Sequence, residues 1–579
     1  MLNFYDFEVF KYDWLVVIIN PVEKTERVIV NNKDELEAYH NAHKKEIWIG
    51  FNSREYDQYI LKGILCGFNP KEINDYIIVK KQRGYTFSRL LNEIPLNNFD
   101  VMPSPATGLK TLEAFMGHDI KESDIPFDID RKLTEKEIEE TIKYCRHDVK
   151  ETIEVFLRKQ DDFNTMMYFI KHFKYPLSYI SKTKAQLAAI MLGGNDKGKS
   201  FDDEFQFPIL DCLQLKKYKY VAEWYRNPEN HKYKVDAENP KSAKHSLETI
   251  VAGVPHTFAW GGGHGARLKY HSKGIFLMID VTAYYPSQQE KFKFGYRVMG
   301  NPENFEFIHH SNIEFKRKGD KKARQPFKIM DNAISGQMKQ RVSTLYDPMS
   351  NNSICINGQL LLLDLIEHLE MENICELIQN NTDGIIIKLH SYDDFERVDD
   401  VVYEWEQRTG MKMDIDQFFG DIFQKDVNNY LIIDRETGAM KAKGAYVKNL
   451  DELDNDLPIV NRAMVEYMSK NIPADETINT CDSLIDFQKV VKLSGKYDYV
   501  MHNGRKYFYK CYRVFASNSS RDGNIFKCRS GANPAKFGNT PEHCFINNDN
   551  IVGAKVPEKL DKQWYIDLAK KRLEQYGVI

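Results

Sequence analysis

The sequence predicts an α/β protein built from several domains. Strand-like apolar runs alternate with helix-like amphipathic segments near the N-terminus and again in the middle of the chain. The length of 579 residues is several times that of a typical domain, so we expect roughly three to five domains or subdomains. A hydrophobic content of 42% and a charged content of 28% are ordinary for a folded protein, and most of the chain is therefore predicted to be ordered.

The composition excludes several classes of protein. A net charge of -4 argues against a uniformly basic nucleic-acid coat, although it allows a basic groove beside an acidic site. The nine cysteines include no Cys-x-x-Cys pair, so neither a zinc ribbon nor a disulfide framework is predicted. No apolar run reaches the roughly 18 residues of a membrane helix, and the N-terminus lacks the pattern of a signal peptide. We expect a cytoplasmic protein without a membrane partner.

Two acids share one face of the first predicted strand. Asp6 and Glu8 are two residues apart, so their side chains point to the same side of the strand. An exposed edge strand is the alternative explanation for this pair. The patterns predict one helix, over residues 34–43, and four strands, at residues 3–10, 14–20, 27–32 and 46–52.

Two further segments place polar side chains at a strand end and on helices. Asn52 ends a strand, and Asp57 begins the next helix, where simple helix capping would also explain the acid. A long helix begins at the capping box of residues 134–137, and on it Tyr144 and Asp148 lie four residues apart on one face. A pair of surface residues would explain either segment taken alone.

Together, the three segments closely resemble the motifs of the DnaQ-like 3′-5′ exonuclease, which has a ribonuclease-H-type fold. The motifs read Asp-x-Glu, Asn-x-x-x-Tyr-Asp and Tyr-x-x-x-Asp, in this order. Four carboxylates suit two divalent cations about 4 Å apart, one activating water and the other stabilising the leaving 3′ oxygen. The resemblance gives Tyr144 the task of orienting the water, and Asn52 and Tyr56 contacts with the DNA end. The implied metal ligands are Asp6, Glu8, Asp57 and Asp148.

A glycine-rich segment follows a region with few motifs. Residues 258–265 read Phe-Ala-Trp-Gly-Gly-Gly-His-Gly, which allows close approach of the backbone to another chain. The segment matches neither a Walker loop nor a dinucleotide fingerprint. A flexible connector is one explanation. The segment also resembles the Tyr-x-Gly-Gly loop that contacts template in family B DNA polymerases, with Gly262 and Gly263 as DNA-binding residues, although the tyrosine is out of register.

An apolar run ends on Asp280 and continues as Asp-Val-Thr-Ala-Tyr-Tyr-Pro-Ser. A buried strand whose last aspartate caps a turn is the simplest explanation of this pattern alone. The stretch also resembles the first palm motif of family B polymerases, Asp-x-x-Ser-Leu-Tyr-Pro-Ser. This resemblance implies that Asp280 and Val281 bind metal. It also makes Tyr285 the steric gate that collides with a ribose 2′-OH, so deoxynucleotides are the expected substrates.

A basic helix is predicted at residues 321–341. Arg324, Lys328 and Asn332 recur every four residues along one stripe, a pattern that usually marks a solvated face. The spacing Lys-x-x-x-Asn-Ala-x-Ser-Gly is nevertheless similar to that of the family B fingers helix, which binds the incoming triphosphate. Lys328 would neutralise phosphate charge. Ser335 stands where the family has tyrosine, so stacking on the nascent base pair would be weaker or come from elsewhere.

The third palm-like element is a hairpin with Asn-Thr-Asp-Gly at its tip. These residues, 381–384, have good turn chemistry, and a plain hairpin is the alternative explanation. The corresponding family B hairpin reads Asp-Thr-Asp-Ser, so Asn381 replaces the first acid. The resemblance assigns the metal chiefly to the second acid, so Asp280 and Asp383 would hold two Mg²⁺ ions, with Mn²⁺ as a possible substitute. The ions would activate the primer 3′-OH and stabilise the pentavalent phosphorus.

Two basic segments follow. The first is similar to the Lys-Gly motif with which the family grips the primer-template duplex, and it contains Lys441, Lys443, Gly444 and Tyr446. The second, residues 495–530, has eight lysines or arginines against two acids, interleaved with aromatic residues that include Tyr497, Tyr499, Tyr507, Phe508, Tyr509 and Tyr512. Such a patch suits phosphate contacts with aromatic support, and a charged β-surface is its alternative explanation.

These motifs stand in the order of a compact, bacteriophage-type family B DNA polymerase with proofreading, which the chain resembles over nearly its whole length. The resemblance implies primer-template DNA, dNTPs and replication accessory proteins as partners, and a monomer in the host cytoplasm. It implies a right-hand polymerase after the exonuclease. The expected parts are the exonuclease (1–160), a connecting region (161–255), palm (256–300 and 346–445), fingers (301–345) and thumb (446–579).

The motif spacing adds a prediction about the primer. Asp280 and Lys328 are 48 residues apart, and Lys328 and Asp383 are 55 apart, which leaves no room for the insertions of protein-primed relatives. We therefore expect extension of a nucleic-acid primer without strong strand displacement. Two alternatives remain: an exonuclease with a degenerate polymerase site, and a non-catalytic DNA-binding accessory.

Overall fold

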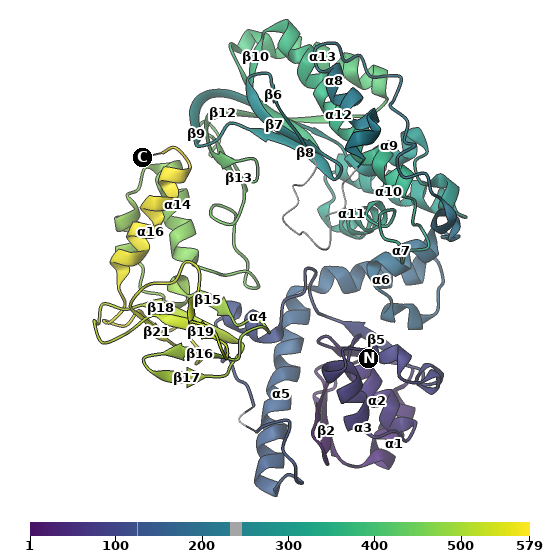
Figure 1. The fold of residues 1–579 in the computed structure, drawn as a ribbon, viewed down its shortest axis with the longest axis vertical. Helices are drawn as coiled ribbons and strands as arrows, with labels where there is room; N and C mark the ends of the chain where they lie inside the picture. Colours follow the sequence, from purple (N-terminus) through teal and green to yellow (C-terminus); the bar gives the residue numbers. More distant parts are fainter. Residues whose placement is uncertain (124, 232–245, 579) are drawn as a thin grey trace. The chain divides into compact units, whose positions relative to one another are not determined.

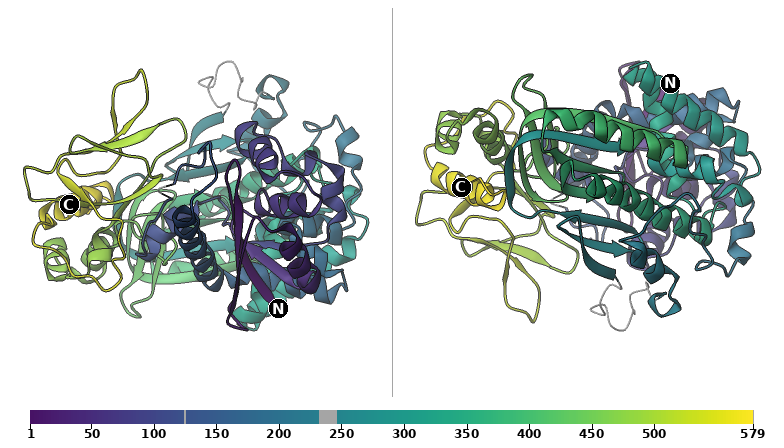
Figure 2. Two further views of the ribbon diagram at one scale, coloured as in Figure 1. Left: turned by 90° about the horizontal axis from the view of Figure 1, so that it is seen from below. Right: turned by 90° about the horizontal axis from the view of Figure 1, so that it is seen from above.

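The computed structural model describes residues 1–123, 125–231 and 246–578, and it confirms a mixed α/β protein with several sheets (Figures 1 and 2). Part of the predicted connecting region, residues 232–245, lies outside the described residues. The chain divides into two compact units. Unit 1 comprises Met1–Thr183, Leu450–Ile459 and Ile478–Tyr565, and unit 2 comprises Lys184–Asn449, Val460–Thr477 and Ile566–Ile579. Nothing in the sequence patterns indicated that the C-terminal region is shared between both units.

The N-terminal sheet of unit 1 has β1 at its centre. The strand order is β3, β2, β1, β4, β5, with β1 antiparallel to β2 and parallel to β4. An exposed edge strand at Asp6 and Glu8 is therefore excluded. The four predicted strands and the first predicted helix are present. The elements are β1 (Leu2–Val9), β2 (Trp14–Asn20), β3 (Thr25–Val30), α1 (Lys33–His43), β4 (Ile47–Gly50), α2 (Asp57–Leu65) and β5 (Asn97–Asp100).

A long helix, α5 (Glu135–Arg158), covers this sheet (Figure 1). It begins at the predicted capping box, in which Thr134 and Glu137 bond reciprocally. The helix packs against β1 and β2, and its buried residues include Cys145 and Asp148. The apolar spacing of the helix thus turns one acid toward the sheet rather than toward solvent.

Arg513 joins the C-terminal part of unit 1 to a short helix near the N-terminal sheet. Its guanidinium is fully buried and donates to the backbone carbonyls of Ala114, His118, Asn547 and Asp549. The short helix is α4 (Leu109–Met116). The strands of the C-terminal part are β15 (Lys489–Lys492), β16 (Tyr499–His502), β17 (Arg505–Tyr507), β18 (Cys511–Ala516), β19 (Ile525–Cys528), β20 (Ala535–Lys536) and β21 (Cys544–Ile546). Two distant parts of the sequence therefore form one body.

Unit 2 is built on a nine-stranded sheet. One face is covered by α12 (Pro348–Glu372) and α13 (Phe395–Thr409), whose apolar side chains form a core with alternate residues of β9 (Figure 1). The strand order is β14, β13, β12, β9, β11, β10, β8, β7, β6. The strands are β6 (Ser246–Val251), β7 (Val254–Ala259), β8 (Gly262–Ala266), β9 (Tyr270–Val281), β10 (Cys375–Asn381), β11 (Gly384–Leu389), β12 (Met413–Asp426), β13 (Asn429–Asp434) and β14 (Met440–Lys443).

The glycine-rich segment is part of this sheet, so its explanation as a flexible connector is wrong. Gly262 begins β8, which pairs with β7 as a hairpin. A Cβ at Gly263 would lie 2.7 Å from Gln359 Oε1, and one at Gly265 would lie 2.4 Å from His256 Nδ1. Gly263 and Gly265 are therefore needed for close packing of β8 against α12 and β7.

Three α-helices lie between β9 and α12 in the chain, and the first of them follows Asp280 closely. They are α9 (Tyr284–Phe292), α10 (Pro302–Arg317) and α11 (Lys321–Ser335). The last two pack against each other. The basic helix predicted at residues 321–341 ends earlier than expected, because the chain turns after Gly336. Among the described helices, none combines the length and apolar character needed to cross a membrane.

Candidate active sites

Four acidic side chains of unit 1 gather around the middle of β1. Asp6 and Glu8 project from β1, Asp57 begins α2, and Asp148 lies on α5. The backbone N–H of Phe7 donates to Asp57 Oδ1 at 3.1 Å, which ties the start of α2 to the strand. Three elements that are distant in sequence therefore deliver the predicted carboxylates to one place.

Burial determines the protonation of these carboxyl groups. Burial first, and then the neighbouring acids, raises the pKa of Asp6 and that of Glu8 well above the ordinary range. Burial also raises the pKa of Asp57 to about 7 and that of Asp148 to about 6. Near neutral pH the cluster therefore cannot carry all its negative charges without a compensating cation. Its oxygen donors are of the kind that Mg²⁺ and Mn²⁺ prefer.

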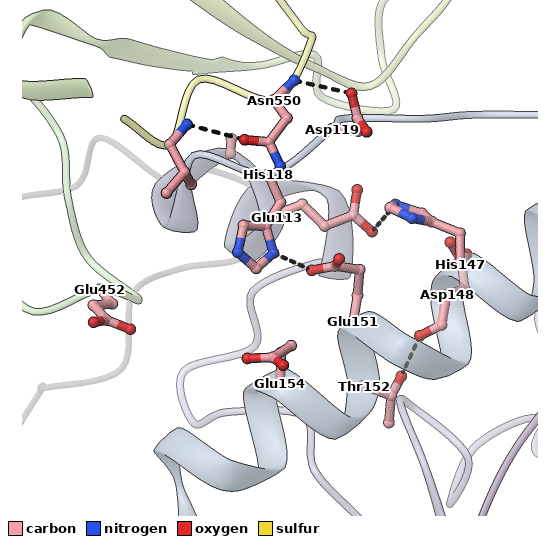
Figure 3. Close-up of polar contacts among 12 residues, drawn as sticks. Glu113, His118, Asp119, His147, Asp148, Glu151, Thr152, Glu154, Glu452 and Asn550 are labelled. Carbon is pink, nitrogen blue, oxygen red and sulfur yellow. Dashed lines mark hydrogen bonds and ion pairs between the residues drawn. The ribbon is translucent and has the colours of Figure 1, made fainter. Parts of the chain in front are cut away.

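A lysine that sequence reasoning missed lies at the edge of this cluster. Lys110 Nζ donates to Asp148 Oδ1 at 2.6 Å and to Glu113 Oε1 at 3.0 Å. Burial acts to lower the pKa of Lys110, but the two carboxylates raise it overall. Glu113 is completely buried and lies beside His147, with 3.8 Å between Oε1 and Nε2 (Figure 3). The only sequence signal was the spacing of three residues between the lysine and the glutamate on α4.

The three other residues predicted for this site differ in their surroundings. The Tyr144 ring lies 4.9 Å from Lys110 Nζ, and its pKa is raised by burial and by the nearby acids, so it belongs to the cluster. Tyr56 donates its hydroxyl to Asn74 Oδ1 at 2.8 Å. Asn52 has a left-handed backbone (φ 57°), and its N–H donates to Asp100 Oδ1. The structure thus places Tyr144 against the acids and gives the other two residues partners outside the set.

A second acidic cluster lies at one end of the unit 2 sheet. The strand register places Asp280 opposite Gly384 on β11 and opposite Asp414 on β12. The backbone N–H of Val281 donates to the carbonyl of Asp383 at 2.8 Å. The predicted pair of aspartates is therefore brought together by backbone hydrogen bonds. Burial raises the pKa of Asp280, against the opposing effect of Lys441.

Two acids of this cluster were not predicted. Asp414 and Asp416 lie on β12, and Lys441 Nζ is 3.4 Å from Asp280 Oδ2 and 3.2 Å from Asp416 Oδ2. Asp414 forms an ion pair with Lys316. The spacing of two residues between these acids repeats that of the acids on β1, and this pattern could have identified them. Lys441, which was predicted to contact DNA, lies among these carboxylates.

The residues predicted to bind nucleotide are in different environments. Lys328 and Asn332 are exposed on α11. Arg324 is partly buried, and its Nε donates to Asn312 Oδ1 at 2.9 Å, so its guanidinium is held by α10. Burial, together with the charge of Asp383 among others, raises the pKa of Tyr285, which places its hydroxyl near the acidic cluster. Of the three residues of the predicted stripe, Arg324 is thus held by a hydrogen bond within the protein, whereas Lys328 and Asn332 are exposed to solvent.

The residues predicted to grip duplex DNA adjoin β13 and β14. Lys443 is exposed at the end of β14. Gly444 has φ 98°, and a Cβ there would lie 2.3 Å from Asn429 Oδ1, so a glycine is required. The Tyr446 ring lies 4.0 Å from the guanidinium carbon of Arg572.

The basic patch at residues 495–530 is a β-surface on which cations and rings pair. Lys506 Nζ lies 4.6 Å from the centre of the Tyr499 ring, and Lys527 Nζ lies 5.2 Å from that of Tyr497. Arg513 was counted in this patch from the sequence, but it is fully buried and binds carbonyls, so it is unavailable to a phosphate. The remaining cations stay candidates for contact with nucleic acid.

The comparisons with known proteins find matches among solved structures. No protein-family model matches the chain, and no curated protein matches it. Among solved structures, the family B DNA polymerase from the hyperthermophilic archaeon Pyrobaculum calidifontis matches all of this chain and 78% of its own, with 13% sequence identity and a TM-score of 0.41. The chain is thus similar to a family B DNA polymerase at a low level, and its functional assignment depends on the two acidic clusters.

Proposed function

We propose that the chain is a template-directed DNA polymerase that adds dNTPs to a primer 3′-OH and carries a 3′-5′ proofreading exonuclease. The strand register around Asp280 is the observation that carries this proposal, because it sets this carboxylate opposite Gly384 and beside Asp383. A carboxylate at the end of β9 and another in the turn between β10 and β11, at an exposed sheet end, suit a reaction between a primer end and a nucleotide.

Mg²⁺ is the proposed cofactor of both sites, with two ions in each and Mn²⁺ as a substitute. Asp280, Asp383 and the carbonyl of Val281 would hold the ions of the polymerase site. When bound, the ions would stabilise the charge that develops on the phosphorus and on the leaving group. Lys441 keeps a positive charge between Asp280 and Asp416, which supports this position as a cation site.

The exonuclease is proposed for residues 1–160. Its four carboxylates, Asp6, Glu8, Asp57 and Asp148, would hold the ions, and Tyr144 would orient the attacking water. Burial of these carboxyl groups and their raised pKa values support the assignment, because a cation relieves the repulsion between them. Asn52 and Tyr56 would contact the 3′ end of the DNA.

The remaining roles belong to the polymerase half of the chain. Tyr285 would exclude ribonucleotides, and Lys328 and Asn332 would bind the incoming nucleotide from the exposed face of α11. The proposed palm spans residues 256–300 and 346–445, the fingers 301–345 and the thumb 446–579, after a connecting region at 161–255. Primer-template DNA, dNTPs and replication accessory proteins are the proposed partners of a monomer.

One experiment separates the candidate activities. Purified protein is given a mismatched primer-template and Mg²⁺, with and without dNTPs, beside Asp280→Ala and Asp6→Ala. We expect removal of the mismatch and extension by the wild type, loss of extension alone in Asp280→Ala, and loss of mismatch removal in Asp6→Ala. Digestion without extension would instead assign a degenerate polymerase site, in line with Asn381, and the absence of both activities would assign a DNA-binding accessory.

A further inference from the structure

A cavity of about 650 Å³ lies in unit 2 beside the end of β9. Its walls come from α9, from α10, from the loop of residues 410–412 and from the start of β12. Thr282 and Asp414 are part of the lining. Thr282 is two residues beyond Asp280 in sequence, and Asp414 is the β12 partner of Asp280. The cavity therefore adjoins the proposed polymerase site.

The lining is strongly basic. Its acids are Glu290 and Asp414, and its cations are Lys291, Lys293, Lys316, Arg317 and Lys412. Both acids already have partners, since Glu290 contacts His310 and Asp414 pairs with Lys316. A ligand that enters the cavity would therefore meet an excess of positive charge.

The cations of the lining differ in whether an acidic side chain pairs with them. Lys293 pairs with Glu306, and Lys412 pairs with Glu406, so acids outside the cavity partly neutralise both. In the part of the chain that the structure describes, neither Lys291 nor Arg317 has an acidic partner. An unpaired guanidinium and an unpaired ammonium on facing helices are suited to grip the oxygens of one anion.

We propose that this cavity binds a polyphosphate group, with Arg317 and Lys291 as its principal ligands. The inference rests on the proposed polymerase function and deepens it, because it names a second set of phosphate ligands beside Asp280. The volume falls within the roughly 300–1,000 Å³ of small-molecule sites, whereas a nucleic-acid backbone would need an open row of cations. Arg324, which the sequence predicts to bind nucleotide, donates a hydrogen bond to Asn312, so Arg317 and Lys291 are the better candidates for binding the phosphates.

Two sources could supply this chemistry. One is the pyrophosphate that leaves when a nucleotide is added, and the other is the triphosphate tail of a nucleotide before the reaction. The first would use the cavity on the way out, and the second would use it on the way in. Both carry the same closely spaced phosphate oxygens, so the cavity chemistry alone recognises either.

Binding of inorganic pyrophosphate tests the site without relying on catalysis. Full-length protein is titrated calorimetrically with pyrophosphate, without divalent metal or DNA, beside the double variant Arg317→Ala/Lys291→Ala. We expect saturable binding by the wild type and an affinity about tenfold lower or worse in the double variant. Lys318→Ala is the matched control, because Lys318 is exposed, pairs with Glu314 and lies outside the lining. Equal binding by wild type and double variant, or none by the wild type, would overturn the proposal.

Kinetics then distinguish the sources. If the cavity receives the leaving group, the double variant needs about tenfold more pyrophosphate for inhibition of extension, while its KM for dNTP is unchanged. If it receives the incoming tail, the KM for dNTP also rises. Either result supports the polyphosphate site. If neither the inhibition by pyrophosphate nor the KM for dNTP changes, the proposal is contradicted.

The milder pair Arg317→Gln/Lys291→Gln replaces the double variant if thermal unfolding reveals a folding defect. Wild-type protein that binds pyrophosphate at this site but extends no primer refutes only the proposed function.

Discussion

The two acidic clusters are assembled in different ways. In unit 1, a central strand and two helices enclose the carboxylates, so burial controls their charge. In unit 2, the adjacent strands β9 and β12 and the turn between β10 and β11 supply them, and Asp383 and Asp416 remain exposed. Each cluster nevertheless has one lysine between two acids, Lys110 in the first and Lys441 in the second. Enclosure thus couples the charge of the unit 1 cluster to pH, whereas the unit 2 cluster has two acids exposed to solvent.

The largest expected effect is the independent loss of the two activities. Asp280→Ala or Asp383→Ala should reduce primer extension by about 10³-fold or more, because a metal ligand is lost, and should leave digestion intact. Asp6→Ala should instead reduce digestion of the primer and leave extension intact. Quenched-flow assays on one labelled primer-template measure both rates. Asp399→Asn, an exposed acid on α13, is the control. Loss of both activities in Asp280→Ala would show that the clusters are not independent.

The next effect concerns pH and distinguishes the enclosed cluster from the open one. The pKa of Asp57 is raised from 3.8 to about 7 in the folded chain, so without metal the folded state binds more protons than the unfolded state between these values. The free energy of unfolding should therefore fall as pH rises from about 4 to about 7, by up to roughly 4 kcal/mol from this residue. Denaturant titrations in EDTA measure it.

Asp57→Asn is the matched variant for the pH effect, because an amide oxygen can still accept from Phe7 N–H without titrating. We expect a flatter pH dependence in this variant, and a flatter dependence for the wild type in Mg²⁺. An identical slope in both proteins would mean that Asp57 does not carry the linkage.

A third effect tests the lysine of the enclosed cluster. Lys110→Met leaves Asp148 and Glu113 without their shared cation, and breaking a buried ion pair typically costs about 3–5 kcal/mol. We expect the free energy of unfolding to fall by about 3 kcal/mol in metal-free denaturant titrations. Lys136→Ala removes a mostly exposed lysine that lies 3.8 Å from Glu140, and should cost less than about 1 kcal/mol. Equal costs for the two variants would contradict the enclosure of the first lysine.

The smallest effect tests the open cluster through its backbone. A Cβ at Gly384 would lie 2.1 Å from Asp280 Oδ1, so Gly384→Ser should displace this carboxylate. We expect extension to slow by about tenfold to 100-fold, with digestion unchanged. Gly495→Ser, where a Cβ meets nothing within 4 Å, is the control. Wild-type extension rates in Gly384→Ser would show that the carboxylate tolerates movement.

Local sequence patterns predicted the elements of both clusters but not their full membership. The acids on β1 and the helix with Tyr144 follow from periods of two and of about four residues, which are local. Lys110 and Asp414 reach their clusters through long-range contacts. Asp414 depends on the pairing of β9 with β12, strands more than 130 residues apart in the chain, and no local period encodes that register. The segment at residues 258–265 was ambiguous because glycine has little intrinsic preference, and packing against His256 and Gln359 decides its conformation.

The buried guanidinium of Arg513 has a consequence for the order of synthesis. This residue satisfies carbonyls of Ala114 and His118, which leave the ribosome some four hundred residues earlier. Unit 1 therefore cannot complete its packing until Arg513 has been made, and most of unit 2, apart from Ile566–Ile579, lies within the intervening sequence. The N-terminal sheet must wait with an unfinished surface while the middle of the chain folds, which makes this interval the period of greatest exposure to aggregation and proteolysis during biosynthesis.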